Sequence, residues 1–424
     1  MDTIFALSSG IPPAGIAVVR ISGSAAGPAF VALAGALPDP RRASLVSLHD
    51  ETGELLDRGL ALWFPGPNTV TGEDLAELHL HGGRAVVSAV EAALSRRAGL
   101  RRAEPGEFTR RAFANGRIDL AEAEGLADLL EAETELQRVV ALSAAGGALS
   151  RRVEGWRERL LTLSAVVEAA LDFGDEDDAA ALPATFAQDV AALAGELEAA
   201  LAEPSTDVLR EGFRVVLAGP PNVGKSSLFN VLVDSEAAIT TPEPGTTRDV
   251  LERSVAVAGI PFTFVDTAGL RADGSDPVER IGIARAGTEI ERAGLVLWLG
   301  PESRGPAGAW EIEPQSDRPD WPKKSAPRHR VSAVTQSGIA ELRADLVVHA
   351  RSALPRPGQA SLNGRQRRHL VDAAEALEVA QDRRNALIIA EELRIARTAF
   401  DKLTGRAGTE DVLDALFGRF CIGK

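Results

Sequence analysis

Apolar and polar positions alternate over short distances in the first part of the chain. Residues 15–21 and 59–64 have the apolar content of strands, and residues 85–94 have helical spacing. A proline- and glycine-rich cluster at 65–68 marks a turn between elements. Residues 1–116 are therefore predicted to form an α+β domain.

From about Asp119 the apolar residues recur at helical spacing, in segments rich in alanine, leucine and glutamate. The expected helices cover residues 119–135, 136–171, 183–201, 362–399 and 410–420. An acidic run at 172–178 interrupts them and is typical of a solvated loop. Between the helical blocks, residues 209–350 alternate strands and helices. This order predicts an inserted α/β domain whose flanking helices pack together.

Residues 219–226 have the sequence Gly-Pro-Pro-Asn-Val-Gly-Lys-Ser, between an apolar run at 215–218 and a helical pattern at 227–232. A strand, a glycine-bracketed loop and a helix form the context of a phosphate-binding P-loop. Its backbone N–H groups and the helix N-terminus attract phosphate oxygens. Lys225 supplies a cation for the β- and γ-phosphates, and the Ser226 hydroxyl is placed to bind Mg²⁺. The chain is therefore predicted to bind a nucleoside triphosphate.

A second strand, residues 262–265, is followed by Asp-Thr-Ala-Gly. Asp266 can hold Mg²⁺ through water, and the N–H of Gly269 can bind the γ-phosphate and so sense hydrolysis. The sequence Gly-Thr-Thr-Arg-Asp at 245–249 offers Thr247 as a further Mg²⁺ ligand. The order and spacing of these motifs favour a switch-type GTPase over a generic ATPase.

These patterns predict a multidomain α+β chain with an inserted, Rossmann-type P-loop domain of the Ras-like class. The expected parts are an N-terminal domain over 1–116, the two halves of a discontinuous all-α helical domain over 117–207 and 353–424, and the inserted domain over 208–352. Residues 301–327, rich in proline, glycine and charge, are expected to form a poorly specified loop.

The composition adds limits on compartment and partners. A net charge of −15 argues against broad affinity for nucleic acid, so any RNA contact must come from local basic patches. The single cysteine, Cys421, excludes an intrachain disulfide and fits a reducing cytosol. The first residues lack the pattern of a signal peptide, and no apolar run is long enough to cross a bilayer. We expect a cytoplasmic protein without a membrane segment.

Asn222 inside the P-loop, together with residues 245–249, resembles the translation-factor-like GTPases that use potassium in place of an arginine finger. In this resemblance the Asn222 amide binds K⁺ beside the phosphates, and the loop 241–246 adds backbone carbonyls. The implied K⁺ ligands are Asn222, Thr241, Glu243 and Thr246. The alternative is that Asn222 is a turn residue whose amide caps its own backbone.

Motifs along nearly the whole chain match one pattern. They lie at residues 2–4, 19–23, 63–68, 71–74, 81–83, 105–109, 266–271 and 278–283, and in the terminal Cys-Ile-Gly-Lys of 421–424. On these motifs the chain resembles the MnmE (TrmE) family of tRNA-modification GTPases. The resemblance implies a folate-binding N-terminal domain that also forms a homodimer, a helical domain and an inserted GTPase domain. It implies GTP, Mg²⁺, K⁺ and a 5-formyl- or 5,10-methylene-tetrahydrofolate as cofactors.

The same resemblance implies a reaction. With a flavoprotein partner of the MnmG/GidA type, in a heterotetramer-type complex, the family adds a carboxymethylaminomethyl or aminomethyl group to C5 of the wobble uridine of certain tRNAs. A tetrahydrofolate derivative is the one-carbon donor. The expected function is a potassium-activated GTP hydrolase that takes part in this modification.

The family's site residues carry over position by position. Arg20, Glu77, Arg117 and Lys424 would contact the folate, because cations suit its carboxylates and Glu77 suits pteridine N–H groups. Outside the resemblance, Arg20 and Arg117 would be interpreted as ordinary surface arginines, and the family more often has lysine where Arg117 stands. Glu279 would orient the attacking water. The implied nucleotide-binding positions are Asn222, Val223, Gly224, Lys225, Ser226, Ser227, Thr241, Pro242, Glu243, Pro244, Gly245, Thr246, Thr247, Asp266, Thr267, Ala268, Gly269, Ser332 and Ala333.

Cys421 has two interpretations. The resemblance implies a functional thiol near the folate, which makes Glu279, Lys225 and Cys421 the expected catalytic residues. The alternative is a small buried thiol under the last helix. His79 and His81 are treated as structural, because no further Cys/His cluster accompanies them.

The guanine-binding motif is the point where the family pattern breaks. No Asn-Lys-x-Asp follows the predicted strand 295–299, and the nearest candidate is Lys-Lys-Ser-Ala at 323–326, ahead of Ser332 and Ala333. In that alignment Ala326 replaces the guanine-binding aspartate, which predicts hydrolysis with weakened guanine discrimination.

Two other functions remain open at this point: a GTPase switch that only binds RNA or ribosomes, and a degenerate scaffold for the flavoprotein, which the missing aspartate favours slightly. The sequence does not identify the tRNA-binding surface. Basic clusters on the C-terminal helices contain Arg365, Arg367, Arg368, Arg383 and Arg384, either as solvated faces or as RNA contacts.

Overall fold

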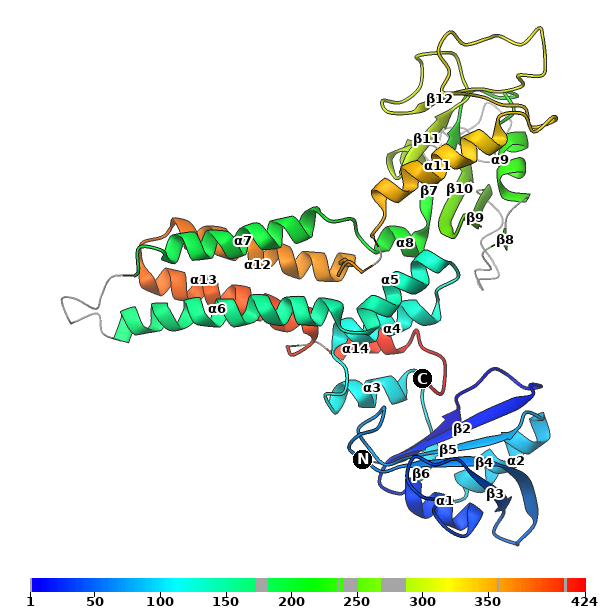
Figure 1. Cartoon of the computed structure of the whole chain (residues 1–424), viewed down its shortest axis with the longest axis vertical. Coiled ribbons are helices and arrows are strands. Elements are labelled where there is room, and N and C mark those ends of the chain that lie inside the picture. The colour runs from blue at the N-terminus through cyan, green and yellow to red at the C-terminus, as the bar shows by residue number, and fades with distance from the viewer. Residues whose placement is uncertain are drawn as a thin grey trace, which may run out of the picture. The chain divides into compact units, whose positions relative to one another are not determined.

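The computed structural model describes residues 2–172, 182–234, 237–238, 251–267, 287–356, 358–407 and 410–424. Contacts divide the chain into two compact units, Met1–Ala127 with Phe400–Lys424, and Asp128–Ala399 (Figure 1). Helices α4 (Leu120–Leu130) and α13 (Ala386–Thr404) contain the two points where the chain passes from one unit to the other. No described helix is long and apolar enough to span a membrane.

The first unit is built on a sheet with the strand order β3-β4-β5-β2-β1-β6. Its neighbouring strands are antiparallel except for β1 and β6, which are parallel. The strands are β1 (Thr3–Leu7), β2 (Ile16–Ser22), β3 (Ser44–His49), β4 (Leu55–Phe64), β5 (Leu75–His81) and β6 (Leu100–Arg102). The strands predicted at 15–21 and 59–64 are present as β2 and β4, and the helix predicted at 85–94 is α2 (Arg84–Ser95).

The two faces of this sheet differ in polarity. On β2, Val19 and Ile21 are fully buried, whereas Arg20 between them lies on the opposite face. Helices α1 (Ala26–Ala34) and α2 contribute apolar residues to the core on the buried face. Glu77 of β5 is the cross-strand partner of Arg20 and therefore shares its polar face.

The C-terminal segment joins the first unit through close approaches of backbone to backbone. Helix α14 (Glu410–Phe417) packs beside α3 (Glu107–Ala114). Gly106 has a φ of 69°, and a Cβ there would lie 2.3 Å from a backbone oxygen of α14, so only glycine fits. Gly423, with a φ of 95°, approaches Leu7 in the same way, since its Cβ would lie 2.2 Å from the Leu7 oxygen.

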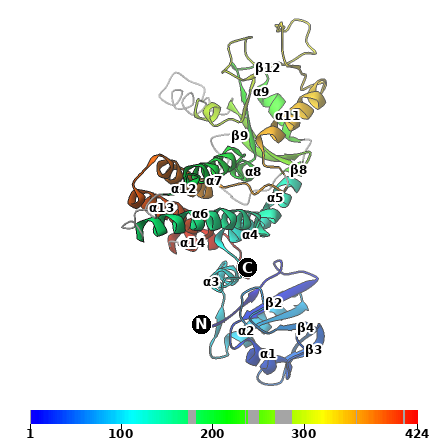
Figure 2. The ribbon, with the colours of Figure 1, turned by 60° about the vertical axis from the view of Figure 1, so that its left-hand side comes forward.

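The second unit contains long helices, of which α6, α7 and α12 run side by side (Figures 1 and 2). Its helices before and after the inserted sheet include α5 (Glu135–Ala145), α6 (Ala148–Asp172), α7 (Phe186–Ala202) and α12 (Gly364–Asp382). The packing of α7 on α12 agrees with the prediction that the flanking helices lie together. The single helix predicted over 136–171 is wrong, because Gly147 has a φ of 77° and separates α5 from α6. The helix predicted over 362–399 is likewise divided, by residues 383–385.

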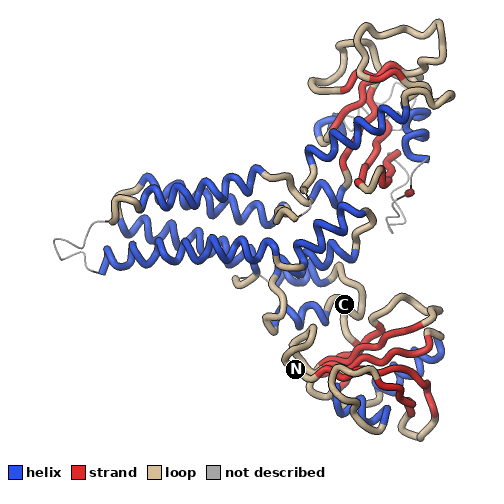
Figure 3. Tube along the Cα trace, in the orientation of Figure 1, coloured by secondary structure: helices blue, strands red, loops and turns tan. Residues whose placement is uncertain are grey.

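The remainder of the second unit contains a second sheet, whose strands are red in Figure 3. Its strand order is β13-β12-β11-β7-β10-β9-β8. Five strands are parallel to their neighbours, and β9 and β8 extend the sheet in antiparallel pairs. The strands are β7 (Phe213–Ala218), β8 (Ala237–Ala238), β9 (Leu251–Val257), β10 (Ile260–Asp266), β11 (Leu295–Trp298), β12 (Trp310–Glu313) and β13 (His329–Arg330). The helices of this region include α8 (Asp207–Glu211), α9 (Lys225–Asp234) and α11 (Ile339–Ala353). Because the carboxyl ends of parallel strands meet at one edge, the loops after β7, β10, β12 and β13 share that edge.

The poorly specified loop predicted over 301–327 is wrong in part, since it contains β12. This strand is only four residues long and alternates Trp310 and Ile312, both buried, with glutamates. Its stability comes from pairing with β11 on one side and β13 on the other. A pattern so short gives no reliable strand signal by itself.

Candidate functional site

The P-loop connects β7 to α9 at the carboxyl edge of the second sheet. Gly219 and Gly224 have φ values of 151° and 102°, and Asn222 between them has a φ of 58°. Lys225 closes the loop, because its Nζ donates to the carbonyl oxygens of Gly219 (3.0 Å) and Pro220 (2.8 Å). Lys225 is only 4% exposed, so its ammonium group is held inside the loop.

Ser226 and Asp266 meet beside this loop. Oγ of Ser226 donates to Oδ2 of Asp266 over 2.5 Å. Strand pairing causes this contact, because β10 lies parallel to β7 with Asp266 opposite Leu217. Thr267 fixes the turn that follows, since its Oγ1 donates to the Leu217 carbonyl oxygen (2.8 Å). An adjacent hydroxyl and carboxylate form the kind of oxygen ligand set that Mg²⁺ accepts.

Several predicted site residues lie outside the described residues. They are Thr241, Pro242, Glu243, Pro244, Gly245, Thr246, Thr247, Ala268, Gly269 and Glu279. Most of the acidic run predicted at 172–178 lies outside them as well. Of the remaining P-loop positions, Val223 is buried, and Asn222 and Ser227 are exposed.

The loops after β12 and β13 lie side by side next to the P-loop. The N–H of Ser316 donates to the carbonyl oxygen of Val331 (3.0 Å), one residue before Ser332. Nε2 of Gln315 donates to the carbonyl oxygen of Val223 in the P-loop (3.2 Å). Residues 314–317 therefore contact both the phosphate loop and the segment that contains Ser332 and Ala333. A nucleotide base attached to phosphates in the P-loop would be expected at this position.

The prediction that residues 323–326 carry the base-binding motif is wrong. Lys324 is 8% exposed, its Nζ donates to the carbonyl oxygen of Trp298 (3.0 Å), and it forms an ion pair with Glu311. This lysine is a structural cation. The segment that directly follows β12 is Pro-Gln-Ser-Asp at 314–317, and its fourth residue, Asp317, is an exposed carboxylate. Asp317 therefore occupies the place after this strand where a base-binding aspartate would stand.

Two of the residues predicted to bind folate, Arg20 and Glu77, form a cross-strand pair in the first unit. Nε of Arg20 donates to Oε1 of Glu77 over 2.7 Å, and Nε2 of His79 lies 3.4 Å from Oε2 of Glu77. The Arg20 side chain is 25% exposed and that of Glu77 is 16% exposed. Both groups therefore remain open to a ligand from the polar face of the sheet. Sequence spacing gave no sign of this contact, which depends on strand register.

Cys421 lies on the segment that follows α14. Its carbonyl oxygen accepts from the N–H of Gly106 (3.4 Å), and the next residue, Ile422, forms an isolated antiparallel bridge with Pro105. The thiol is free and exposed. The alternative of a buried thiol under the last helix is therefore wrong.

The chain then passes the end of β1. Gly423 contacts Leu7, and Leu7 is the strand partner of Val19, the residue before Arg20. Lys424 follows directly and is partly exposed. The structure thus brings the 421–424 segment to β1, the strand that pairs with the Arg20 strand, β2.

Arg117 lies between α3 and α4, next to the loop that connects β4 to β5. A Cβ on Gly72 would lie 3.3 Å from the Arg117 Cγ, so the Arg117 side chain packs on that loop. The loop is bound to β2, because the hydroxyl groups of Ser22 and Thr71 are 2.7 Å apart. Ser22 follows Arg20 by two residues and so shares its face of the strand.

A buried charge network, which the sequence analysis missed, holds these segments together. Arg111 is 6% exposed and contacts carboxylate oxygens of Asp2 (2.9 Å), Glu73 (3.1 Å) and Glu107 (3.0 Å). Burial disfavours the charged form of Glu107, but hydrogen bonds from Arg101 and Arg111 outweigh it and hold the Glu107 pKa below its usual value. Asp2 and Glu73 are 109 and 38 residues from Arg111 in the sequence, so no local pattern indicates the full network.

The basic cluster on the C-terminal helices is in part structural. Both terminal nitrogens of Arg367 donate to the last turn of α7, to the carbonyl oxygens of Leu201 (2.6 Å) and Glu203 (3.1 Å). This side chain therefore caps α7, and the packing of α12 on α7 explains it without RNA. Arg383 and Arg384 are exposed between α12 and α13.

Comparisons with known proteins agree with this geometry. The family profile for the MnmE helical domain matches residues 120–421, and that for the N-terminus of the GTP-binding protein TrmE matches residues 3–117. The tRNA modification GTPase MnmE of Novosphingobium aromaticivorans is 62% identical over 100% of both chains. That of Erythrobacter litoralis is 61% identical, again over 100% of both chains.

A solved structure, the G domain of the T. maritima FeoB iron transporter, is 25% identical over 32% of this chain and 98% of its own, with a TM-score of 0.23. The assignment rests on the full-length relatives, because so low a TM-score supports no structural argument. Matches of two family profiles, and identities above 60% over the whole length, show that this chain belongs to the MnmE family of tRNA modification GTPases.

Proposed function

We propose that this chain is a potassium-activated GTP hydrolase which, with a flavoprotein partner, adds a carboxymethylaminomethyl or aminomethyl group to C5 of the wobble uridine of certain tRNAs. The one-carbon unit comes from a tetrahydrofolate. The observation that carries the proposal is the contact of Gly423 with Leu7 at the end of β1, because β1 pairs with β2, which carries Arg20, and Arg20 binds Glu77. A GTPase switch alone needs neither that thiol-bearing segment nor the polar pair.

GTP is held by its phosphates in the P-loop. Lys225 already lies inside the loop and needs only to exchange two carbonyl contacts for phosphate oxygens. Ser226 and Asp266, the latter through water, fit Mg²⁺, with Thr247 as a third ligand. The ion supplies positive charge that stabilises the triphosphate as the γ-phosphate leaves. Glu279 orients the attacking water.

Guanine is recognised by Asp317. A carboxylate at the end of residues 314–317 accepts two hydrogen bonds from the N1–H and the C2 amino group of guanine, which adenine lacks. Gln315 replaces the lysine of the common motif and ties this segment to Val223 of the P-loop. Ser332 and Ala333 support the base from the neighbouring loop.

Potassium is held beside the phosphates by Asn222. The φ of 58° at Asn222 lies in the left-handed region, which asparagine adopts more readily than most residues other than glycine. Its exposed amide adds an oxygen that a glycine would not supply. Thr241, Glu243 and Thr246 complete the K⁺ ligands.

The folate lies on the polar face of the first sheet. Arg20, Arg117 and Lys424 are cations that suit its carboxylates, and Glu77 accepts from the N–H groups of the pterin. The tetrahydrofolate supplies a one-carbon unit. Cys421, exposed on the segment that ends at Lys424, is the functional thiol of this centre.

The remaining parts of the proposal concern assembly. The N-terminal domain, residues 1–116, binds folate and forms the homodimer; residues 117–207 and 353–424 form the helical domain, and residues 208–352 form the inserted GTPase domain. The homodimer combines with a flavoprotein of the MnmG/GidA type in the cytosol. GTP hydrolysis in the inserted domain drives chemistry at the folate centre.

Analysis of tRNA from cells that lack this chain tests the proposal. We expect the wobble-uridine modification to be absent, to return with the wild-type chain and to remain absent with Cys421→Ser. Because the thiol is exposed, the purified Cys421→Ser protein should fold and hydrolyse GTP normally. An unchanged wobble modification in the deletion strain would overturn the proposal.

The scaffold alternative loses its support. It rested on a missing guanine-binding aspartate, and the proposal assigns that role to Asp317. Potassium-dependent GTP turnover by the purified chain would exclude it directly.

A further inference from the structure

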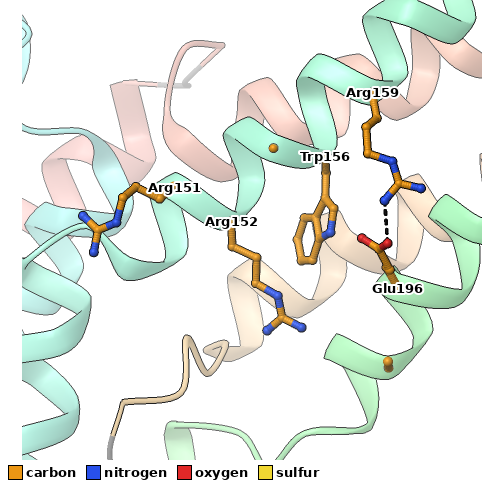
Figure 4. A pocket seen from close by; sticks show the side chains of 7 residues that line it. Arg151, Arg152, Trp156, Arg159 and Glu196 are labelled. Atoms are coloured by element: carbon orange, nitrogen blue, oxygen red, sulfur yellow. Dashed lines mark hydrogen bonds and ion pairs between the residues drawn. The ribbon is translucent and has the colours of Figure 1, made fainter.

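A hollow on the second unit lies between α6 and α7, and none of the residues that line it belongs to the P-loop or to the polar pair of the first sheet. It has a volume of about 380 Å³ and is lined by Arg151, Arg152, Gly155, Trp156, Arg159, Glu196 and Ala199 (Figure 4). We propose that this hollow binds the phosphate backbone of the tRNA. The inference deepens the proposed function and rests on it, since it takes the polyanion to be the tRNA substrate.

The arginines are arranged in a row by helical spacing. Arg151, Gly155 and Arg159 follow one another at intervals of four residues on α6, and such residues lie on one face of a helix. Eight residues at 1.5 Å each separate the outer arginines by about 12 Å along the axis. One phosphate group is too small to contact both ends of this row. A chain of phosphates, as in a nucleic acid, fits it.

Each guanidinium is fixed by its surroundings. Arg152 lies over the ring of Trp156, with its Cζ 5.0 Å from the ring centre, and also pairs with Glu203 (3.1 Å). Arg159 pairs with Glu196 over 2.5 Å. An arginine carries five N–H donors, so these contacts orient the group and leave donors for a phosphate. Trp156 itself is 3% exposed, which makes it a support for Arg152 and excludes base stacking.

Arg151 provides positive charge that no carboxylate of the described residues pairs with. Its NH1 donates to the carbonyl oxygen of Gly146 (2.8 Å). In a chain with a net charge of −15, a local excess of cations is what RNA binding requires. Arginine also matches phosphate oxygens with two parallel hydrogen bonds.

Gly155 keeps the hollow open. It lies within α6, where glycine weakens a helix, and a Cβ there would meet no atom within 4 Å. Neither a left-handed φ nor a close backbone contact therefore explains glycine at this position. The absence of a side chain leaves space between Arg151 and Arg159, and this is the space a phosphate would occupy.

Binding of unfractionated bacterial tRNA to the purified full-length chain, measured at several KCl concentrations, tests the inference. We expect Arg151→Gln and Arg159→Gln to weaken binding about three- to tenfold each and to lower the slope of log K against log salt by about 0.7–0.9. Arg151→Lys should retain most of the affinity. Glu196→Gln should strengthen binding, because it removes a negative charge from the hollow. A purely structural role would not produce this gain.

Two further variants separate binding from folding. Gly155→Ala and Gly155→Gln should both raise Tm, since each restores helix propensity. The glutamine should lower tRNA affinity by filling the hollow, whereas alanine should change it little. Arg157→Gln is the matched charge control, because Arg157 lies on the same helix, pairs with Glu154 (3.2 Å) and does not line the hollow.

The outcomes are distinguishable from failure of the proposed function. If the wild-type chain binds tRNA and all α6 variants bind it equally well with an unchanged salt slope, the inference is wrong and the proposed function stands. If Arg157→Gln weakens binding as much as Arg151→Gln, the effect is one of general charge and the inference is wrong. If the variants lose the flavoprotein and keep tRNA, the hollow is a protein-docking site. If the wild-type chain neither binds tRNA nor restores wobble modification, the proposed function itself fails.

Discussion

The side-chain amide of Gln315 donates a hydrogen bond to the backbone carbonyl of Val223, over 3.2 Å. The bond joins the segment after β12 to the P-loop, so residues 314–317 are held next to the loop that is expected to bind the phosphates. Asp317 lies two residues after Gln315, so the same contact holds its carboxylate near the P-loop.

Asp317→Asn should weaken GTP binding and relax the choice of base. Hydrogen bonds to a charged group contribute about 1.5–3 kcal/mol each, so we expect roughly a ten- to hundredfold loss in GTP affinity. An amide also offers an N–H donor where the carboxylate only accepts, so the variant should gain affinity for xanthosine triphosphate, which carries a carbonyl at C2. Competition binding with GTP, ATP and xanthosine triphosphate measures both changes.

Asp320→Asn is the control for this prediction. Asp320 is exposed, lies three residues further on and pairs with Arg318 at 3.5 Å. Equal GTP preference in the Asp317→Asn and wild-type proteins would remove Asp317 from the base site.

Asn222→Gly should abolish potassium stimulation of GTP hydrolysis. Glycine accepts the φ of 58° at this position, so the loop keeps its shape and loses only the amide. We expect turnover in KCl to fall to the wild-type level in NaCl, with nucleotide affinity little changed. The measurement is initial GTP turnover in matched KCl and NaCl buffers. Retention of the full potassium effect would leave Asn222 as a turn residue only.

Glu77→Gln should weaken binding of 5-formyltetrahydrofolate without affecting GTP turnover. Loss of one charge-assisted hydrogen bond, about 1.5–3 kcal/mol, predicts roughly a tenfold or greater rise in Kd. The stability cost should stay below about 1 kcal/mol, because the Arg20–Glu77 pair lies at a surface. Titration calorimetry on the full chain measures the affinity.

Glu91→Gln is the matched control for Glu77→Gln. Glu91 pairs with Arg102 (2.8 Å) and lies on α2, against the apolar face of the same sheet. If both variants bind the folate equally well, Glu77 is a structural partner of Arg20 and does not contact the ligand.

The Asp345 carboxylate should make the second unit sensitive to acid. Hydrogen bonds from Arg328 and then His329 lower the Asp345 pKa from 3.8 to about 2. A lowered pKa means that the stabilisation is fully present above pH 3.8, the value expected in the unfolded chain, and disappears as the pH falls through the folded value near 2. The Tm difference between wild type and Asp345→Asn should therefore be constant from pH 7 to 5 and shrink below pH 4. A difference that grows in acid would contradict this assignment.

The phosphate site was predictable from sequence because its residues are contiguous. The loop 219–226 carries its glycines, lysine and serine within eight positions, and Asp266 follows a strand that is apolar enough to recognise. The structure places Lys225, Ser226 and Asp266 as the local pattern requires. Recognition of the strands and helix at the start of the chain succeeded for the same reason, since each has a clear periodicity.

The residues proposed for the base site and the folate site depend on contacts between positions far apart in the sequence. Asp317 was missed because the sequence analysis predicted a loop where β12 lies. This short strand is stabilised by pairing with β11 and β13, which its own sequence does not reveal. Arg20 and Glu77 are 57 residues apart and meet through strand register. Resemblance to a family identified these two residues as candidates, whereas composition and spacing could not.

The close backbone contacts of Gly106 and Gly423 determine when the first unit can finish folding during synthesis. Gly106 receives the backbone of Phe417, and Gly423, itself within residues 400–424, meets Leu7, yet β1 leaves the ribosome first. All of residues 128–399 must be translated before the partners of Leu7 and Gly106 exist. At about 5–20 residues per second the N-terminal sheet waits tens of seconds for its last segment. A nascent chain that stalls within residues 128–399 therefore lacks the segment that packs on Leu7 and Gly106, and the first unit stays incomplete until translation ends.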